Sequence, residues 1–232
     1  KPSDLGFSDE LHHLPELHEI TTIINNEKPL HKNGQMSMFN FPAVNFFEIK
    51  QEVRNTIDKR CQMAVEKAKG NDSSVYWVNL NDEAKLISYY DNSAIEIKGK
   101  MNIDKKEDIL KNFSNGNIKK LITKTSITAF GLNWQHCNHT VYFPTFSYEQ
   151  WYQSLRRFWR YGQQNEVIAD RVLSDGQKRI LDAIEIKTAK AKLAENSMAC
   201  CLHKIFFSVR AAAAARIAEP NAKRYQLMYR QR

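Results

Sequence analysis

Cysteine is scarce in this sequence, and long apolar runs are missing. The 232 residues include four cysteines, at positions 61, 137, 200 and 201, and no two of them have the CxxC spacing of a structural zinc site. We interpret all four as reduced structural residues, which favours a cytoplasmic protein. No stretch reaches the roughly 20 consecutive apolar residues of a membrane helix, and no apolar leader follows Lys1. We therefore expect no metal site and no membrane partner.

The glycine-rich loops that hold nucleotide phosphates are also missing. No GxxxxGK(S/T) segment occurs, so the chain has no loop of this kind to cradle β- and γ-phosphates. No GxGxxG follows a predicted strand, which argues against a dinucleotide-dependent metabolic enzyme. Asp82 and Glu83 stand together like a Mg²⁺-binding acidic pair, but they begin a predicted helix, and we interpret them as its cap. We expect the chain to build only half of an ATP site and to belong to a larger enzyme.

What the sequence does contain is typical of a globular protein with a positively charged surface. Hydrophobic residues make up 42% of the chain and charged residues 26%, and the length fits one α/β domain with extensions. The formal net charge of +8 favours polyanionic partners such as nucleic acid. Charge of this size also occurs for solubility alone, so it indicates a partner only weakly.

Predicted strands alternate with predicted helices along most of the chain. Apolar residues at every fourth position predict a helix over residues 46–69, with Ile49, Val53, Ile57, Cys61 and Val65 on its buried face. The predicted strands are residues 74–80, 94–98, 121–125, 140–143 and 166–173. This alternation predicts a parallel sheet flanked by helices. We expect a connecting segment at 1–45 with a short strand at 19–24, an α/β domain at 46–175, and a helical extension at 176–232.

The strongest candidate site is a predicted helix over residues 148–161. Gln153, Arg157 and Arg160 fall at i, i+4 and i+7, so they would share one helix face. The opposite face carries Tyr148, Tyr152, Leu155 and Trp159. Two guanidinium groups and an amide on one side form a clamp for phosphate oxygens. The alternative is a solvated basic face without a ligand.

The spacing Gln153-x-x-x-Arg157-x-x-Arg160-x-Gly162-Gln163 resembles motif VI of superfamily 2 helicases, especially the Swi/Snf-like branch and related phage helicases. The resemblance implies that Arg160 is an arginine finger and Arg157 its companion on the ATP phosphates, where both act as catalytic groups. Gln153 would help orient the nucleotide. Much of the superfamily has Gly where this chain has Arg156, so which of the two adjacent arginines points inward stays open.

A second segment, residues 121–133 with the sequence LITKTSITAFGLN, resembles motif V of the same helicases. The resemblance implies that Thr125 and Ser126 hold nucleic-acid phosphates without reading bases. Gly131 would let the backbone turn closely, and Asn133 would tie this loop to the ATP cleft. The alternative is an ordinary β–α turn. The segment precedes the first one by about 20 residues, in the order that the family shows.

Weaker signals extend the expected nucleic-acid site. The end of the predicted strand at 94–98, with Gly99 and Lys100, resembles the motif IV region and is a candidate backbone contact. Trp134 is a candidate for stacking on bases, although such aromatic residues more often lie in the core. Residues 1–6 resemble the stretch that leaves the first lobe in phage-type helicases.

These resemblances imply a RecA-like lobe, the second of two, in an ATP-dependent DNA helicase or translocase. They imply a first RecA-like lobe in the same polypeptide, ATP and Mg²⁺ as cofactors with the Mg²⁺ ligands on that first lobe, and DNA as partner, with RNA left open. The isolated chain should show little ATPase activity. Two alternatives stay open: a non-enzymatic nucleic-acid-binding module, and the motor-derived lobe of a restriction or remodelling complex.

Overall fold

The computed structural model describes residues 14–25, 31–32, 35–36, 46–128, 133–145 and 147–178, together with 182, 185, 186, 189 and 193. The chain divides into two compact units, residues 14–187 and residues 1–13 with 188–232. All the helices and strands named below belong to the first unit. Most of the predicted helical extension at 176–232 and the predicted motif at 1–6 lie outside the described residues.

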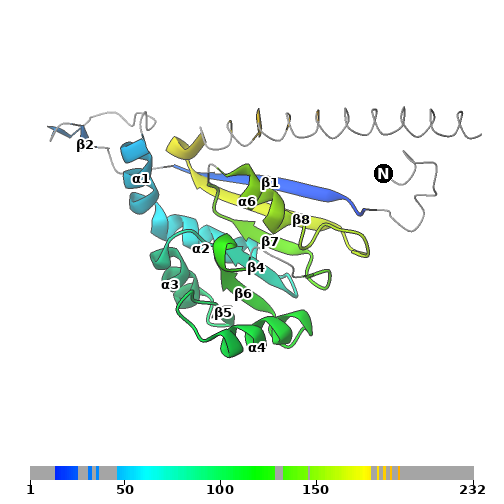
Figure 1. Ribbon diagram of the computed structural model, residues 1–232. Helices are drawn as coiled ribbons and strands as arrows, with labels where there is room; N and C mark the ends of the chain where they lie inside the picture. The colour runs from blue at the N-terminus through cyan, green and yellow to red at the C-terminus, as the bar shows by residue number, and fades with distance from the viewer. Residues whose placement is uncertain are drawn as a thin grey trace, which may run out of the picture. The chain divides into compact units, whose positions relative to one another are not determined.

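Six parallel strands form the sheet of the first unit, in the order β1-β8-β7-β4-β6-β5 (Figure 1). In chain order the strands are β1 (Leu17–Ile24), β4 (Ser74–Trp77), β5 (Ala94–Glu96), β6 (Lys120–Thr123), β7 (His139–Tyr142) and β8 (Val167–Ser174). The short pair β2 (His31–Lys32) and β3 (Gln35–Met36) forms a separate antiparallel ladder. The helices are α1 (Phe46–Asn55), α2 (Ile57–Lys67), α3 (Asn81–Tyr90), α4 (Ile103–Ser114), α5 (Thr125–Thr128) and α6 (Tyr148–Leu155), and a 3₁₀ turn, η3 (Asp175–Gln177), follows β8.

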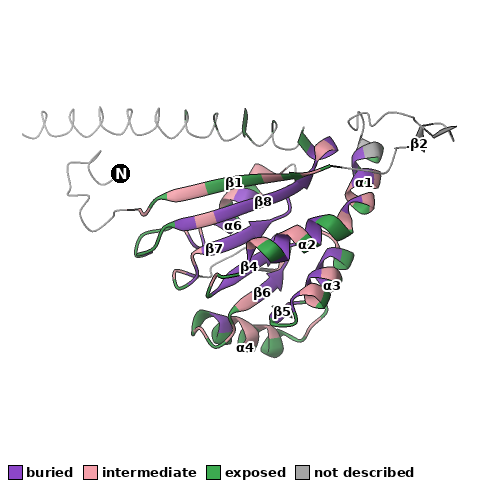
Figure 2. Ribbon diagram, turned by 180° about the vertical axis from the view of Figure 1, so that it is seen from behind, coloured by how far each residue is buried: buried purple, intermediate pink, exposed green. Residues whose placement is uncertain are grey.

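Alternating residues of the central strands build two hydrophobic layers, one on each face of the sheet. Val75 and Trp77 belong to one cluster, together with side chains of α4 and α6. Tyr76 and Val78 belong to the other, together with side chains of α2 and α3. Because helices cover both faces, β4 is buried at every position, as Figure 2 shows for the middle of the sheet. The predicted parallel α/β fold is confirmed.

The predicted start of the domain at residue 46 is too late. β1 pairs with β8 along its whole length, from Leu17 opposite Val167 to Ile24 opposite Ser174. The short strand predicted at 19–24 is therefore an integral edge strand of the main sheet. Its side chains are only partly buried, so the sequence lacks the strong alternation that marks a core strand.

Two of the predicted helices differ from the observed ones. The predicted helix at 46–69 is divided at Thr56, whose hydroxyl donates to the carbonyl of Glu52 at 2.8 Å. The predicted helix at 148–161 ends at Leu155, and this earlier end changes the geometry of the candidate site.

The described cysteines, Cys61 and Cys137, are buried free thiols. Burial raises their pKa values, to about 12 for Cys61 and about 11 for Cys137, so both stay neutral, as expected of structural residues.

Candidate functional site: two pockets at the carboxyl edge of the sheet

The carboxyl ends of β4, β5 and β6 open onto a cleft of about 520 Å³. Ligands of open parallel sheets commonly bind at this edge, because the loops that follow the strands meet there. We call this cleft the lysine cleft. It is lined by Val78, Asn81, Lys85, Glu96, Ile97, Lys98, Gly99, Lys100, Thr123, Lys124, Ser126 and Ile127. Register explains why separate segments meet, since β5 and β6 are paired and end side by side.

Positive charge dominates the lysine cleft, with four lysines against one carboxylate. Lys98 forms an ion pair with that carboxylate, Glu96, at 3.4 Å, and its side chain is 64% exposed. Lys124 donates to the side-chain oxygen of Asn81 at 2.8 Å, which joins the loop after β6 to the start of α3. Solvated cations on converging loops suit a polyanion and carry no means of reading bases.

The structure brings several predicted nucleic-acid residues together. Gly99, Lys100 and Ser126 all line the lysine cleft, and all three are exposed. Thr125 is buried, with 6% of its surface exposed, and it lines a neighbouring pocket instead. The prediction for Trp134 is wrong: its ring is fully buried, so neither face is available to a base.

The neighbouring pocket joins the predicted motif V to α6. It has a volume of about 340 Å³ and is lined by Thr125, Ser126, Ser147, Glu149, Gln150, Gln153 and Ser154. We call it the Gln153 pocket. Ser126 lines both pockets, so the predicted nucleic-acid and nucleotide residues are neighbours. Ser147, which also lines this pocket, caps the start of α6: its hydroxyl accepts from the amide of Gln150 at 3.3 Å.

The early end of α6 separates the two arginines that were expected on one face. After Leu155 the backbone tightens, and Arg157 and Phe158 donate to the carbonyls three residues earlier, at 3.4 and 3.1 Å. Gln153 and Arg160 are exposed, whereas Arg157 is 3% exposed. The prediction of a shared Gln153–Arg157–Arg160 face is therefore wrong.

Arg157 lies in the aromatic core. Its guanidinium carbon lies 5.2 Å from the ring centroid of Trp134 and 5.9 Å from that of Trp77. Its Nε and Nη1 atoms are buried and find no hydrogen-bond partner among the residues that the structure describes. Burial lowers the pKa of Arg157 to about 10, so the group is still charged near neutral pH. Among the described residues, no carboxylate pairs with this buried cation, which is an unusual and costly arrangement.

Arg156, the other candidate for the inward arginine, lies over different rings. Its guanidinium carbon is 5.1 Å from the ring centroid of Tyr152 and 4.7 Å from that of Trp159. Arg157 is thus the arginine that points into the core, and Arg156 lies along α6 and the turn after it.

The turn after α6 is fixed by residues that the motif contains but that we did not assign a role. Gly162 has a φ of 94°, and a Cβ there would lie 2.7 Å from the side-chain nitrogen of Gln135. Gln163 is buried and donates to the carbonyls of Cys137 and Phe158 at 3.2 and 3.3 Å. These contacts tie the turn to the chain segment that follows motif V. The Gly-Gln pair at the end of the motif was the sequence feature that could have predicted this turn.

Two of the predicted nucleotide residues, Gly131 and Asn133, belong to the end of motif V, just before that segment. Asn133 is exposed, and its amide donates to the side-chain oxygen of Gln135 at 3.1 Å. Gln135 in turn donates to the carbonyl of Tyr161, so Asn133 is linked to the turn that carries Arg160. Gly131 lies outside the described residues.

Among the described residues, one group has metal-ligand spacing: Glu16, His18 and Glu166, whose ligand atoms lie within 4.8 Å of one another. The group is largely exposed, and an ion pair of 3.2 Å between His18 and Glu166 already accounts for its geometry.

No helix in the described part of the chain is long and apolar enough to cross a membrane.

Part of the chain matches a known protein family, and the fold is similar to that of solved structures. Residues 54–162 match the Helicase_C family, the helicase conserved C-terminal domain. No curated protein sequence matches the chain. The chain is similar to S. cerevisiae Dbp5 bound to Gle1 and IP6, with 14% identity, coverage of 75% of this chain and 40% of that chain, and a TM-score of 0.52. It is also similar to the E. coli DEAD-box protein SrmB bound to RraA (15% identity, 55% and 78% coverage, TM-score 0.47) and to the C-terminal part of the Fun30 ATPase domain (14%, 61% and 48%, 0.46).

At these identities the structural likeness shows the fold, a RecA-like parallel sheet of the kind found in helicase C-terminal domains. The chain spans about half the length of the Fun30 structure and 40% of the Dbp5 chain. The family match covers motif V and all of the motif VI segment except Gln163. The family match is the finding that supports a helicase C-terminal lobe; the Swi/Snf-like or phage-type branch stays a prediction.

Proposed function

We propose that this chain is the second lobe of an ATP-dependent nucleic-acid helicase or translocase, and that the lysine cleft grips the nucleic-acid backbone. The observation that carries the proposal is the convergence of Gly99, Lys100 and Ser126 with three further lysines at one edge of the sheet. Lysine ammonium groups, hydroxyls and loop amides bind phosphate oxygens of any sequence. DNA is the expected partner, and RNA is the alternative that the test below includes.

The second part of the proposal assigns the nucleotide side of the lobe. Gln153 is exposed on α6, where it lines the Gln153 pocket, and Arg160 is exposed in the turn after this helix. We propose that both side chains face ATP bound to a preceding lobe, with Arg160 as the arginine finger. Arg157 fits a phosphate by its chemistry, since its two unpaired donors lack acceptors, but its side chain has to leave the indole rings first. Asn133 supports the turn through Gln135, and the role of Gly131 in the nucleotide site stays a prediction.

The residues present fit phosphate groups and do not fit Mg²⁺. The carboxylates that line the two pockets are Glu96, which is paired with Lys98, and Glu149. Mg²⁺ requires oxygen ligands in octahedral geometry, so we propose that its protein ligands belong to the preceding lobe. Bound Mg²⁺–ATP would supply the reactive phosphate, and this lobe would supply cationic groups that stabilise charge on it.

Charge removal in the lysine cleft tests the grip. A Lys98→Ala/Lys124→Ala variant should weaken binding of a fluorescein-labelled single strand about tenfold and lower the salt slope by roughly 1.4, since each lost phosphate contact on a single strand contributes about 0.7. Fluorescence anisotropy on DNA and RNA oligonucleotides of equal length, at several salt concentrations, measures both.

The matched control is Lys105→Ala/Lys111→Ala, which removes equal charge from exposed positions of α4 that do not line the cleft. It should change the affinity by less than a factor of two. Equal losses for the two double variants would show that only net charge matters, and the proposed grip would be wrong.

One observation favours the rival interpretation of a nucleic-acid-binding module without an ATP cycle. The burial of Arg157 removes one of the two expected phosphate contacts from the surface. In that case the lysine cleft would bind nucleic acid, and Arg160 would have no catalytic role.

A further inference from the structure

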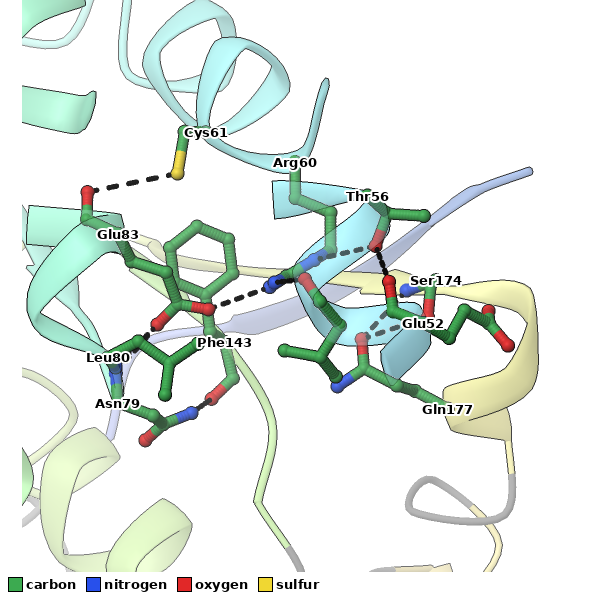
Figure 3. A network of polar contacts seen from close by, with 11 residues as sticks. Glu52, Thr56, Arg60, Cys61, Asn79, Leu80, Glu83, Phe143, Ser174 and Gln177 are labelled. Carbon is green, nitrogen blue, oxygen red and sulfur yellow. Dashed lines mark hydrogen bonds and ion pairs between the residues drawn. The ribbon is translucent and has the colours of Figure 1, made fainter. Parts of the chain in front are cut away.

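A second buried arginine, Arg60, has all of its guanidinium nitrogens paired. It donates to the carboxylate of Glu83 at 3.0 Å, to the carbonyl of Val53 at 2.8 Å, and to the hydroxyl of Thr56 at 3.2 Å (Figure 3). Both side chains of the Arg60–Glu83 pair are 1% exposed. The guanidinium carbon of Arg60 also lies 5.1 Å from the ring centroid of Phe143. Such a pair needs full hydrogen bonding to offset the cost of burying two charges.

The other oxygen of Glu83 reaches the loop between β4 and α3. It accepts from the backbone amides of Asn79 and Leu80, both at 2.9 Å. The side chain of Asn79 donates to the carbonyl of Phe143 at 2.8 Å, which ties the same loop to the end of β7. Figure 3 shows Glu83 between the guanidinium on one side and the loop amides on the other. One carboxylate therefore holds both the helix α2 and the loop.

This loop leads directly into the lysine cleft. The next residue after Leu80 is Asn81, which lines the cleft and whose side-chain oxygen accepts from Lys124 at 2.8 Å. A shift of the loop backbone would move Asn81 and, with it, the ammonium group of Lys124. The contacts thus form a continuous chain from α2 to the charged wall of the cleft.

We propose that Arg60 and Glu83 are positioning residues for nucleic-acid binding, which they control by fixing the loop that presents Asn81 to Lys124. The inference rests on the proposed function of the lysine cleft. It goes beyond helix capping, because capping alone would affect stability and leave affinity unchanged. Electrostatics gives a sign that separates the two effects: removing a negative charge near a basic cleft should strengthen polyanion binding, whereas loss of positioning should weaken it.

The test is a double-mutant cycle on the full 232-residue chain, with single-stranded DNA binding as the readout. Glu83→Gln keeps the side-chain shape, but its amide presents donors to either Arg60 or the loop amides. We expect it to weaken binding about fivefold in the native chain and by less than twofold in a Lys124→Ala background, since coupled residues are not additive. Glu107→Gln, on an exposed carboxylate of α4 outside the cleft, is the matched control and should leave affinity unchanged.

Each outcome has one meaning. Unchanged or tighter binding by Glu83→Gln, or equal losses in the two backgrounds, overturns the positioning role while the proposed grip stands. If Lys124→Ala itself leaves binding unchanged, the proposed grip by Lys124 fails, and the positioning role fails with it. If Glu83→Gln does not fold, the Arg60→Met/Glu83→Leu variant replaces the pair by apolar groups, a change that buried ion pairs often tolerate. The same cycle then applies, with the same expected losses.

Discussion

Replacing Arg157 by methionine should make the protein more stable. Arg157 is 3% exposed, and its Nε and Nη1 are buried without partners in the described part of the chain. Methionine keeps the unbranched stem, fills irregular gaps in a core, and has no donor to satisfy. The two tryptophan rings that now lie against a cation would then lie against a thioether, which also packs well on aromatic rings.

The size of the gain follows from two opposing contributions. Burial lowers the pKa of Arg157 to about 10, and a shift of this size means a cost of roughly 3 kcal/mol for keeping the group charged in the fold. The contacts with Trp77 and Trp134 offset part of that cost, since a desolvated cation–π contact is worth about 0.5–2 kcal/mol. We expect a net gain of about 1–2 kcal/mol for Arg157→Met, or roughly 2–8 °C in the midpoint of thermal unfolding for a domain of this size.

Urea and thermal unfolding followed by circular dichroism measure the effect. Arg160→Met is the matched control, because Arg160 is exposed and such substitutions usually change stability by less than about 0.5 kcal/mol. Destabilisation by Arg157→Met of about 1 kcal/mol or more would refute the reasoning. It would show that Arg157 is a net stabilising core residue, held by its rings, and not a group with unmet hydrogen-bonding demand.

The other predictions concern catalysis and acid stability. In a protein that joins this chain to its ATPase lobe, Arg160→Ala should lower nucleic-acid-stimulated ATP turnover about 10³-fold or more, as loss of an arginine finger does, while affinity for the strand persists; unchanged turnover in a coupled phosphate-release assay would favour the module without an ATP cycle. Burial alone would raise the pKa of Asp91, but hydrogen bonds from Ser93, Lys120 and Tyr76 outweigh it and leave the pKa lowered. A lowered folded pKa contributes stability that is present above the unfolded pKa and lost as pH falls through the folded value. Asp91→Asn should therefore flatten the loss of stability between neutral and acidic pH, and an unaltered pH profile of unfolding would contradict this role.

The core strands of the parallel sheet could be predicted from the sequence, because buried strands have a recognisable residue pattern. β4, β6 and β7 are short runs of apolar and β-branched residues that follow turn residues, and helices cover both faces, so no polar face confuses the pattern. The sequence predicts β1 only as a short strand in a connecting segment, because an edge strand has one neighbour and its side chains contact solvent. Its membership of the sheet depends on β8, which lies more than 140 residues away in the chain.

The site was harder to predict, because its geometry depends on one helix end. Residues 148–161 keep a helical pattern of apolar and charged positions, and local propensity gives no reason to stop at Leu155. The stop is a tertiary effect: Gln163 and Gly162 hold the turn against the segment at 133–137. Once the turn is fixed, Arg157 lies in the core and Arg160 in solvent. Of the cleft lysines, Lys100 was predicted from its place after a strand, but Lys85 and Lys98 were not. A solvated lysine and a phosphate-binding lysine look alike in sequence until the strand ends are brought together.

The two least accessible arginines of the described residues differ in how their guanidinium groups are satisfied. Arg60 and Arg157 are both nearly inaccessible, at 0% and 3% exposure, and both lie near aromatic rings. Arg60 has a carboxylate, a hydroxyl and a carbonyl as acceptors, and that carboxylate is itself saturated by loop amides. Among the described residues, Nε and Nη1 of Arg157 have no acceptor. Each unmet donor costs about 1–3 kcal/mol, and Arg60 shows that the same fold can satisfy a buried guanidinium at all three nitrogens. Sites of uncompensated cost tend to be functional, and this contrast is the reason to test Arg157 in nucleotide binding as well as in stability.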